Sequence, residues 1–163
     1  MDIHYARRKE LRKAAAFLND CWRWAYKDII DPEYLVGLSD KERHKKLRRH
    51  YKEGKRPLLL FSEQNELLGF CGFGSSLTEG YPEDGEISAI YVREDAVGQG
   101  YGHTLFVRAE EILYAQGYTH LVLDVLSQNT RAIAFYRAHG YVRTGDRQFK
   151  CGGREYPMDI MRK

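Results

Sequence analysis

The stretch EISAIYVREDAVGQGYGHTLFVRAEEILYAQGYTHLVLDVL, residues 86–126, joins two apolar runs through a glycine-rich turn and a helical pattern. EISAIYV (86–92) predicts a strand, and apolar residues at three- and four-residue steps predict a helix over 101–116. HLVLDVL (120–126) is apolar on both faces apart from Asp124, which is typical of a buried parallel strand. We therefore expect a right-handed unit of strand, crossover helix and parallel strand.

Outward from this unit, the chain is helical toward its N-terminus and strand-rich toward its C-terminus. Ser39 and Glu42 form a capping-box pattern at the start of a basic helix. Pro157 fits poorly inside a central strand, so we expect the last strand to pair only from Met158 onward. The fold class predicted is α/β with a mixed sheet. The other predicted elements are a strand at 2–6, helices at 8–26, 33–37 and 130–139, a hairpin of 58–63 with 67–74, and a final hairpin turning at Gly152-Gly153.

Composition indicates a globular chain: its 163 residues are 43% apolar and 13% aromatic, and we expect one domain over 1–163. Residues 1–56 would form the N-terminal strand and a group of helices on the side of one substrate, the acceptor. Residues 57–163 would form the sheet and the core that binds the other ligand. The charged N-terminal residues do not resemble a signal peptide, and no apolar run is long enough to span a membrane, so we expect a cytoplasmic protein. The 3 Cys and 6 His are scattered, so neither a disulfide framework nor a metal site is predicted.

Positive charge is concentrated in one segment. The chain has a net charge of +3, while KERHKKLRRHYKEGKR (41–56) has nine Lys and Arg against two Glu, a net of +7. Such a helix could bind nucleic acid or an acidic partner. It could equally be a solvated helix face, and we favour this second interpretation, so nucleic acid is not the expected partner.

The glycine-rich turn VGQGYGHTL (97–105) lies where a strand becomes a helix. There, unpaired backbone N–H groups and the positive end of the helix dipole favour an anion, and glycines let the backbone approach phosphate oxygens. The Rossmann pattern fails because His103 occupies the place of its third glycine, and the P-loop pattern fails because no Gly-Lys-Ser/Thr triplet is present. The glycines could also serve the turn conformation alone.

Two motifs together resemble the GNAT superfamily of acetyl-CoA-dependent N-acetyltransferases, over roughly residues 57–163. The family's loop reads Q/R-x-x-G-x-G/A; this chain has Gly100 and Gly102 in place but Val97 where Gln or Arg is usual. The second motif, N-x-x-A-x-x-F-Y followed by G-F/Y, matches NTRAIAFY (129–136) and Gly140-Tyr141 without a gap. The resemblance implies a mostly antiparallel sheet with helices on both faces, whose central parallel pair splays to hold acetyl-CoA.

The resemblance also implies which residues contact acetyl-CoA. Pantetheine amides would pair with the strand before the loop like an added strand, and the loop would hold the diphosphate. Asn129 would bind the pantetheine arm, although its type also suits a simple helix cap. The implied cofactor-binding residues are Ile90, Tyr91, Val92, Val97, Gly98, Gln99, Gly100, Tyr101, Gly102, His103, Thr104, Asn129, Ala132 and Phe135.

Amine attack on a thioester needs a proton acceptor and a proton donor for the departing thiolate. The resemblance implies that Tyr136 is this donor; the alternative is a helix aromatic of the core. It also implies that Glu86 is the base, directly or through water; the alternative is an exposed strand-end carboxylate. Strand alternation predicts Glu86 on one face with Ile90 and Val92, and Ile87 on the other.

The acceptor is an amine of unidentified class. Trp22 and Tyr26 lie one helical turn apart and could wall its site, or they could simply pack in the core. We expect no metal, no membrane contact, and a monomer or homodimer. Two alternatives remain open at this point: a non-catalytic module that binds coenzyme A, and an acetyltransferase that reaches a nucleic-acid-bound amine through the basic 41–56 helix.

Overall fold

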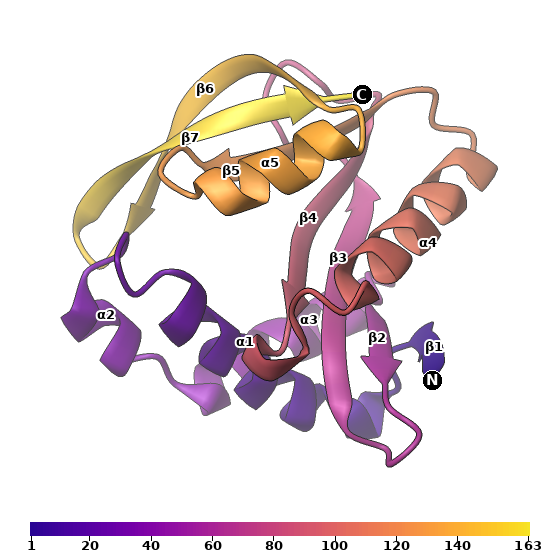
Figure 1. The fold of residues 1–163 in the computed structure, drawn as a ribbon, viewed down its shortest axis with the longest axis vertical. Helices are drawn as coiled ribbons and strands as arrows, with labels where there is room; N and C mark the ends of the chain where they lie inside the picture. Colours follow the sequence, from indigo (N-terminus) through magenta and orange to yellow (C-terminus); the bar gives the residue numbers. More distant parts are fainter.

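A computed structural model describes residues 1–163 as a seven-stranded sheet with the strand order β1-β2-β3-β4-β5-β7-β6 (Figure 1). All neighbours are antiparallel except β4 and β5, which are parallel. The strands are β1 (Asp2–Tyr5), β2 (Leu58–Phe61), β3 (Leu67–Ser75), β4 (Gly85–Val92), β5 (Leu121–Leu126), β6 (Val142–Cys151) and β7 (Arg154–Arg162). The helices are α1 (Leu11–Ala25), α2 (Pro32–Val36), α3 (Asp40–Lys52), α4 (Tyr101–Ala115) and α5 (Thr130–Ala138). The predicted mixed α/β fold is therefore confirmed.

The sheet has an apolar core on each face. Because side chains alternate along a strand, Leu58 and Leu60 of β2 pack with α4 and α5, whereas Leu59 and Phe61 pack with α1 and α3. Both sets are buried, which explains why the run LLLF has no polar member. The two cores place α4 and α5 on one side of β4 and the N-terminal helices on the other.

The helix boundaries follow the capping signals in the sequence. Ser39 Oγ accepts a hydrogen bond from the Glu42 backbone N at 3.3 Å at the start of α3, as predicted. Asp31 caps α2 in the same way, with its Oδ1 accepting from the Glu33 backbone N at 3.0 Å. No helix of the structure combines the length and the apolar character that a membrane crossing requires.

Strands β4 and β5 diverge soon after they begin. They pair only through Gly85 with Leu121 and through Glu86 with Val122. Beyond these pairs β5 stays paired with β7, so the β5-facing edge of β4 lacks a neighbouring strand. The splayed parallel pair implied by the GNAT resemblance is present.

A β-bulge in β4 makes the predicted side-chain alternation wrong. Gly72 of β3 pairs with Ala89 and Phe73 pairs with Ile87, so Ser88 is an extra residue. Ile87 therefore packs on the α4 and α5 side of the sheet, where Ile90 and Val92 also lie, instead of opposite them. Glu86 is shifted to the face of Ala89 and Tyr91.

The expectation for Pro157 is wrong for one neighbour of β7. Strand β7 pairs with β6 along its whole length, including Pro157 with Gln148. Its pairing with β5 does begin at Met158, as predicted. The Pro157 carbonyl accepts a hydrogen bond from the Ser127 backbone N at 2.9 Å, so the residue ends the β5 ladder without leaving the sheet.

Candidate active site

The glycine loop presents a row of free backbone donors. Gly98 and Gly100 have φ angles of +81° and +84°, a left-handed conformation that favours glycine, and Gly100 is the N-cap of α4. The first backbone N–H of this helix to find an acceptor is that of Thr104, which donates to the Gly100 carbonyl at 3.0 Å. The six N–H groups from Gly98 to His103 have no protein acceptor, so they are available as donors to an anion at a helix N-terminus.

Side chains of the loop brace it rather than reach outward. Gln99 Nε2 donates to the Asp95 carbonyl at 3.0 Å, and Thr104 Oγ1 donates to the Gly100 carbonyl at 3.1 Å. His103 Nδ1 lies 2.9 Å from His139 Nε2, so this ring is tied to α5. Val97 and Tyr101 are half-buried, and Tyr101 packs against the core. Any anion at this loop would thus be held mainly by backbone groups.

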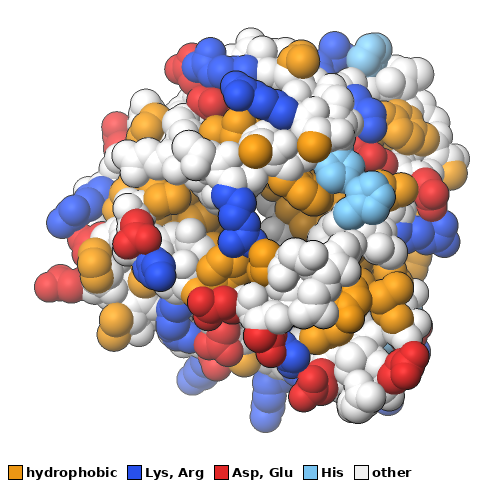
Figure 2. All heavy atoms as spheres, viewed as in Figure 1, with side chains coloured by type: hydrophobic (Ala, Val, Ile, Leu, Met, Phe, Trp, Pro, Cys, Tyr) orange, Lys and Arg blue, Asp and Glu red, His pale blue; other side chains and the backbone are white.

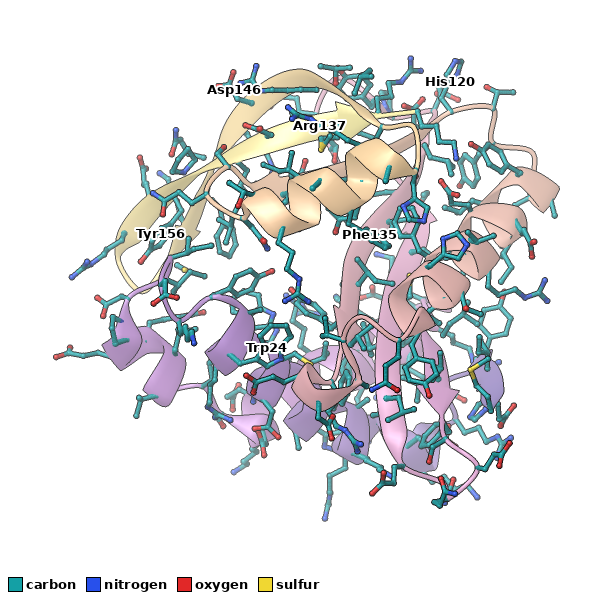
Figure 3. The ribbon with its side chains drawn as sticks, viewed as in Figure 1. Trp24, His120, Phe135, Arg137, Asp146 and Tyr156 are labelled. Atoms are coloured by element: carbon teal, nitrogen blue, oxygen red, sulfur yellow. The ribbon has the colours of Figure 1, made fainter.

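A cleft follows the edge of β4 away from the loop. We call it the splayed cleft; it has two connected parts of about 270 Å³ and about 260 Å³. Figure 2 shows a hollow beside hydrophobic side chains in the middle of this face. In Figure 3, Trp24 of α1 and Phe135 of α5 lie on opposite sides of the gap. Both parts of the splayed cleft are lined by Trp24, Ala25, Ile90, Val92, Asn129, Ala132 and Tyr136.

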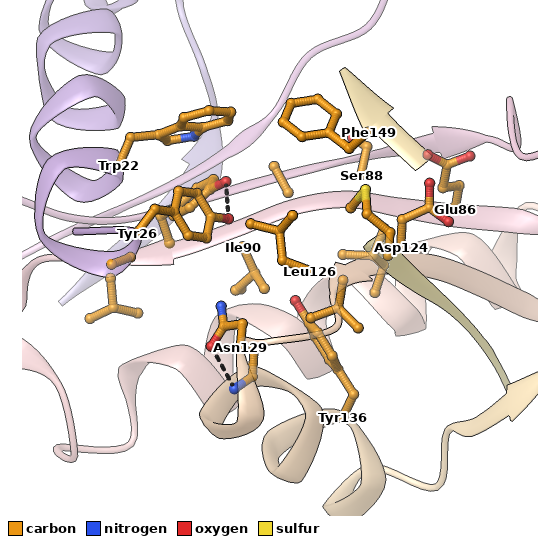
Figure 4. Close-up of a pocket in the computed structure, with 18 of the residues that line it drawn as sticks. Trp22, Tyr26, Glu86, Ser88, Ile90, Asp124, Leu126, Asn129, Tyr136 and Phe149 are labelled. Atoms are coloured by element: carbon orange, nitrogen blue, oxygen red, sulfur yellow. Dashed lines mark hydrogen bonds between the residues drawn. The ribbon is translucent and has the colours of Figure 1, made fainter. Parts of the chain in front are cut away.

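Asn129 serves as a helix cap and still faces the cleft. Its Oδ1 accepts from the Ala132 backbone N at 3.2 Å, which starts α5. Its amide nitrogen has no partner in the protein and points into the splayed cleft (Figure 4). Capping and ligand binding are therefore compatible at this residue.

Tyr136 is buried but its hydroxyl is free. The side chain is 8% exposed and points from α5 into the splayed cleft, where its hydroxyl has no hydrogen-bond partner in the protein (Figure 4). Burial raises the pKa of Tyr136 far above its ordinary value of 10.0. The phenol therefore stays protonated at neutral pH, which suits a proton donor and not a base.

Glu86 is fixed by two hydrogen bonds at a position that borders two cavities. Its Oε2 accepts from the Leu77 backbone N at 2.7 Å and from the Thr78 hydroxyl at 3.2 Å. The other carboxylate oxygen has no donor in the protein. Glu86 lines the splayed cleft and also a second cavity of about 310 Å³ on the α1 and α3 side of the sheet. We call this second space the acceptor cavity.

Trp22 and Tyr26 lie beside both spaces. Their rings are 5.0 Å apart in an edge-to-face arrangement, and the Tyr26 hydroxyl lies 2.9 Å from that of Tyr91. Both residues line the splayed cleft (Figure 4). Trp22 also lines the acceptor cavity, whereas Tyr26 does not. Both pack against a small apolar cluster under α2, as the core-packing alternative predicts, and their role at an acceptor site stays a prediction.

Three features of this region escaped the sequence analysis. The Trp24 indole N–H is buried without a partner at the rim of the cleft, where Arg131 lies over its ring at 5.1 Å. Asp124, the one acid in its apolar strand, forms an ion pair with Arg147 inside the splayed cleft. For Asp124, the only available signal was that it is the one acid in HLVLDVL. The third feature is the basic wall of the acceptor cavity, which is built largely from α3.

Comparison with known proteins agrees with this geometry. Residues 17–141 match the model of the acetyltransferase (GNAT) family. The chain is 30% identical over 151 residues to the uncharacterized N-acetyltransferase YuaI of Bacillus subtilis (strain 168), covering 93% of this chain and 86% of that protein.

Solved structures share the fold. The ribosomal-protein-alanine N-acetyltransferase of Brucella melitensis superposes with a TM-score of 0.77 at 23% identity, covering 100% of this chain and 99% of that one. The protein yncA of Salmonella typhimurium, solved with its cofactor acetyl-CoA, gives a TM-score of 0.74 at 18% identity, covering 100% of this chain and 92% of that one. Family model, relative and fold agree, and the chain belongs to the GNAT family of acetyl-CoA-dependent N-acetyltransferases.

Proposed function

We propose that the protein transfers the acetyl group of acetyl-CoA directly to a primary amine, with Glu86 as base and Tyr136 as acid. The observation that carries this proposal is the pair of spaces that meet at Glu86: the splayed cleft on one side and the acceptor cavity on the other. Such an arrangement lets two substrates approach from opposite faces of β4 without crossing.

The residues of the cleft fit acetyl-CoA. The six free N–H groups from Gly98 to His103 can hold its diphosphate, and the unpaired edge of β4 from Ile90 to Val92 can receive the pantetheine amides. Asn129, Ala132 and Phe135 would flank that arm. When bound, acetyl-CoA supplies an acetyl group on a thioester that an amine can attack.

Proton transfer is assigned to Glu86 and Tyr136, each of which lines the cleft and has an oxygen without a partner in the protein. The other carboxylate of the cleft, Asp124, is engaged in an ion pair with Arg147. The free oxygen of Glu86 would take the proton of the incoming ammonium group, directly or through a water, while Leu77 and Thr78 fix the other oxygen. The Tyr136 hydroxyl would give its proton to the departing thiolate. Thr78 is then a positioning residue for Glu86.

No thiol of the chain is suited to carry the acetyl group. Burial raises the pKa of Cys71 and Cys151, and it raises the pKa of Cys21 to about 12. None of the three lines the splayed cleft. Direct attack by the amine is therefore favoured over an acetyl-cysteine intermediate.

Replacement of Glu86 tests the base. We expect Glu86→Gln to lower kcat about 100-fold, the scale of general-base catalysis, and its remaining activity to rise more steeply with pH than that of the wild type, because free amine must then come from solution. Glu83→Gln, the same charge change at an exposed loop position, should keep wild-type activity. The measurement is thiol release from acetyl-CoA with a panel of amines between pH 6 and 9. Wild-type kcat in Glu86→Gln would refute the assignment.

A further inference from the structure

The acceptor cavity has a strongly basic wall, and this wall bears on which amine the enzyme accepts. Among the charged residues that line it, Glu86 is the only acid. Its basic lining residues are Arg43, Lys46, His50, Lys55 and Arg56. Three of these belong to α3, the helix that carries most of the positive charge noted in residues 41–56 of the sequence.

Arg43 is built into this wall by a buried network. Its Nε donates to Asn19 Oδ1 at 2.9 Å, and Asn19 Nδ2 donates to Asp40 Oδ1 at 2.6 Å. Asn19 is fully buried, and the Arg43 guanidinium lies over the Trp22 ring at 4.8 Å. The two terminal nitrogens of Arg43 have no protein acceptor. Because the network fixes the guanidinium, these two nitrogens can donate a bidentate pair of hydrogen bonds to a carboxylate or a phosphate.

Lys46 adds a second positive charge without a partner. It lies one turn after Arg43 on the same face of α3, with Leu47 docked in the core beside it, and no carboxylate lies within ion-pair distance of either cation. Lys46 is an exposed residue whose side chain lines the cavity; partial desolvation lowers its pKa, and the neighbouring charges of Arg43 and Arg49 lower it further. An anion in the cavity would relieve this repulsion.

The other basic residues are already engaged or point away. Lys55 pairs with Glu53 at 3.5 Å, and Arg56 donates to the Ala6 carbonyl while packing over the rings of Tyr5 and Tyr51. Burial lowers the pKa of His50, and the charge of Lys46 adds to this effect, so both favour the neutral imidazole. The exposed basic residues of the opposite face of α3 are Lys41, Lys45, Arg48 and Lys52.

We propose that the acceptor is a small amine that also carries a carboxylate or phosphate group, with Arg43 and Lys46 binding this anion while the amine lies at Glu86. The proposal rests on the function proposed above. A cavity of about 310 Å³ admits a small molecule, and its positive wall repels a polyamine.

Matched acceptor pairs test the charge preference. The probes are three amino acids with their C-terminal amides, O-phosphoethanolamine with ethanolamine, glucosamine 6-phosphate with glucosamine, and spermidine. We expect kcat/KM to be at least about tenfold higher for the anionic member of a productive pair, the scale of one charge-assisted hydrogen bond. The first set reports on carboxylates and the next two pairs on phosphates. Equal or better use of the neutral members, or of spermidine, would overturn the proposal.

Variants of α3 assign the effect to individual residues. Arg43→Gln and Lys46→Gln should each raise the KM of the anionic acceptor about tenfold and leave the KM of acetyl-CoA unchanged. Lys45→Gln removes the same charge from a residue of the same helix that does not line the cavity, and it should change neither. An equal effect of all three variants would show that only the general field of the helix matters, and it would contradict the proposed site.

A binding measurement separates this inference from the proposed reaction. Trp22 lies under Arg43, so inorganic phosphate and succinate should change its fluorescence in a saturable way, recorded in a Trp24→Phe background that leaves one of the two tryptophans. Arg43→Gln should abolish the change, and Lys45→Gln should preserve it. Absence of any saturable change would overturn the anion site even if amines are acetylated. Absence of turnover with every amine would instead refute the proposed function, and the fluorescence result would still decide the anion site.

Discussion

At the scale of single residues, Tyr136 and Asn129 could be located from the sequence because their motif is contiguous on one short helix. The face of Glu86 could not be predicted, because it depends on Ser88 being an extra residue opposite Gly72. A Cβ on Gly72 would lie 3.0 Å from Ser88 Oγ, a tight contact that the glycine avoids beside the bulge. Such a contact between strands leaves no local signal.

The free hydroxyl of Tyr136 gives a prediction at this scale. Tyr136→Phe should lower kcat about tenfold to 100-fold with little change in the KM of acetyl-CoA, because only the proton donor is lost. Steady-state thiol release measures both constants. Tyr114→Phe, at a half-exposed position of α4 outside both cavities, is the matched control. Unchanged turnover in Tyr136→Phe would refute the acid assignment.

At the scale of elements, the glycine loop and the first turn of α4 were predictable, because three closely spaced glycines between a strand and a helix are a local signal of a tight turn with exposed N–H groups. The basic helix α3 was only partly predictable from the sequence. Its charge was plain in the sequence, but the cavity-facing subset Arg43 and Lys46 is fixed by the docking of Leu47 against the core. Pro157 shows the same limit, since its tolerance depends on which neighbouring strand would need its missing N–H.

The left-handed conformation of Gly100 gives a prediction for this loop. Gly100→Ala should lower the free energy of unfolding by about 1 kcal/mol, because an L residue is strained at a φ of +84° although the site has open space. It should also weaken acetyl-CoA binding by displacing the neighbouring N–H groups. Gly74→Ala, in equally open space without a positive φ, is the control. Urea unfolding and calorimetric titration measure the two effects, and equal behaviour of the two variants would contradict the role of the loop.

At the scale of the whole molecule, the proposed function places the two substrates on opposite faces of the sheet. The acetyl-CoA side would be formed by α4, α5, the glycine loop and the C-terminal end of α1, and the acceptor side by α3 and the preceding turns of α1 (Figure 1). Glu86 lines the cavities on both sides, at the last pair before β4 diverges from β5. The sequence predicted the fold well because its motifs span this central region, whereas the acceptor cavity is assembled from segments far apart in the chain.

Buried tyrosines give a prediction for overall stability. Burial raises the pKa of Tyr91, Tyr136 and Tyr141, so the folded protein keeps these phenols protonated while the unfolded chain ionises them near pH 10. Stability should therefore fall as the pH rises above about 10, by about 1.4 kcal/mol per pH unit for each such tyrosine. Urea unfolding at pH 8, 10 and 11 measures this. Tyr136→Phe should reduce the slope, and an identical slope in that variant would contradict the prediction.

A crystal structure of the protein with coenzyme A tests most directly whether the backbone of the glycine loop recognises the cofactor. We expect the diphosphate to accept hydrogen bonds from the N–H groups between Gly98 and His103, with the pantetheine arm along the free edge of β4. Coenzyme A bound at another surface, with these N–H groups still lacking an acceptor, would contradict the proposed site and the mechanism built on it.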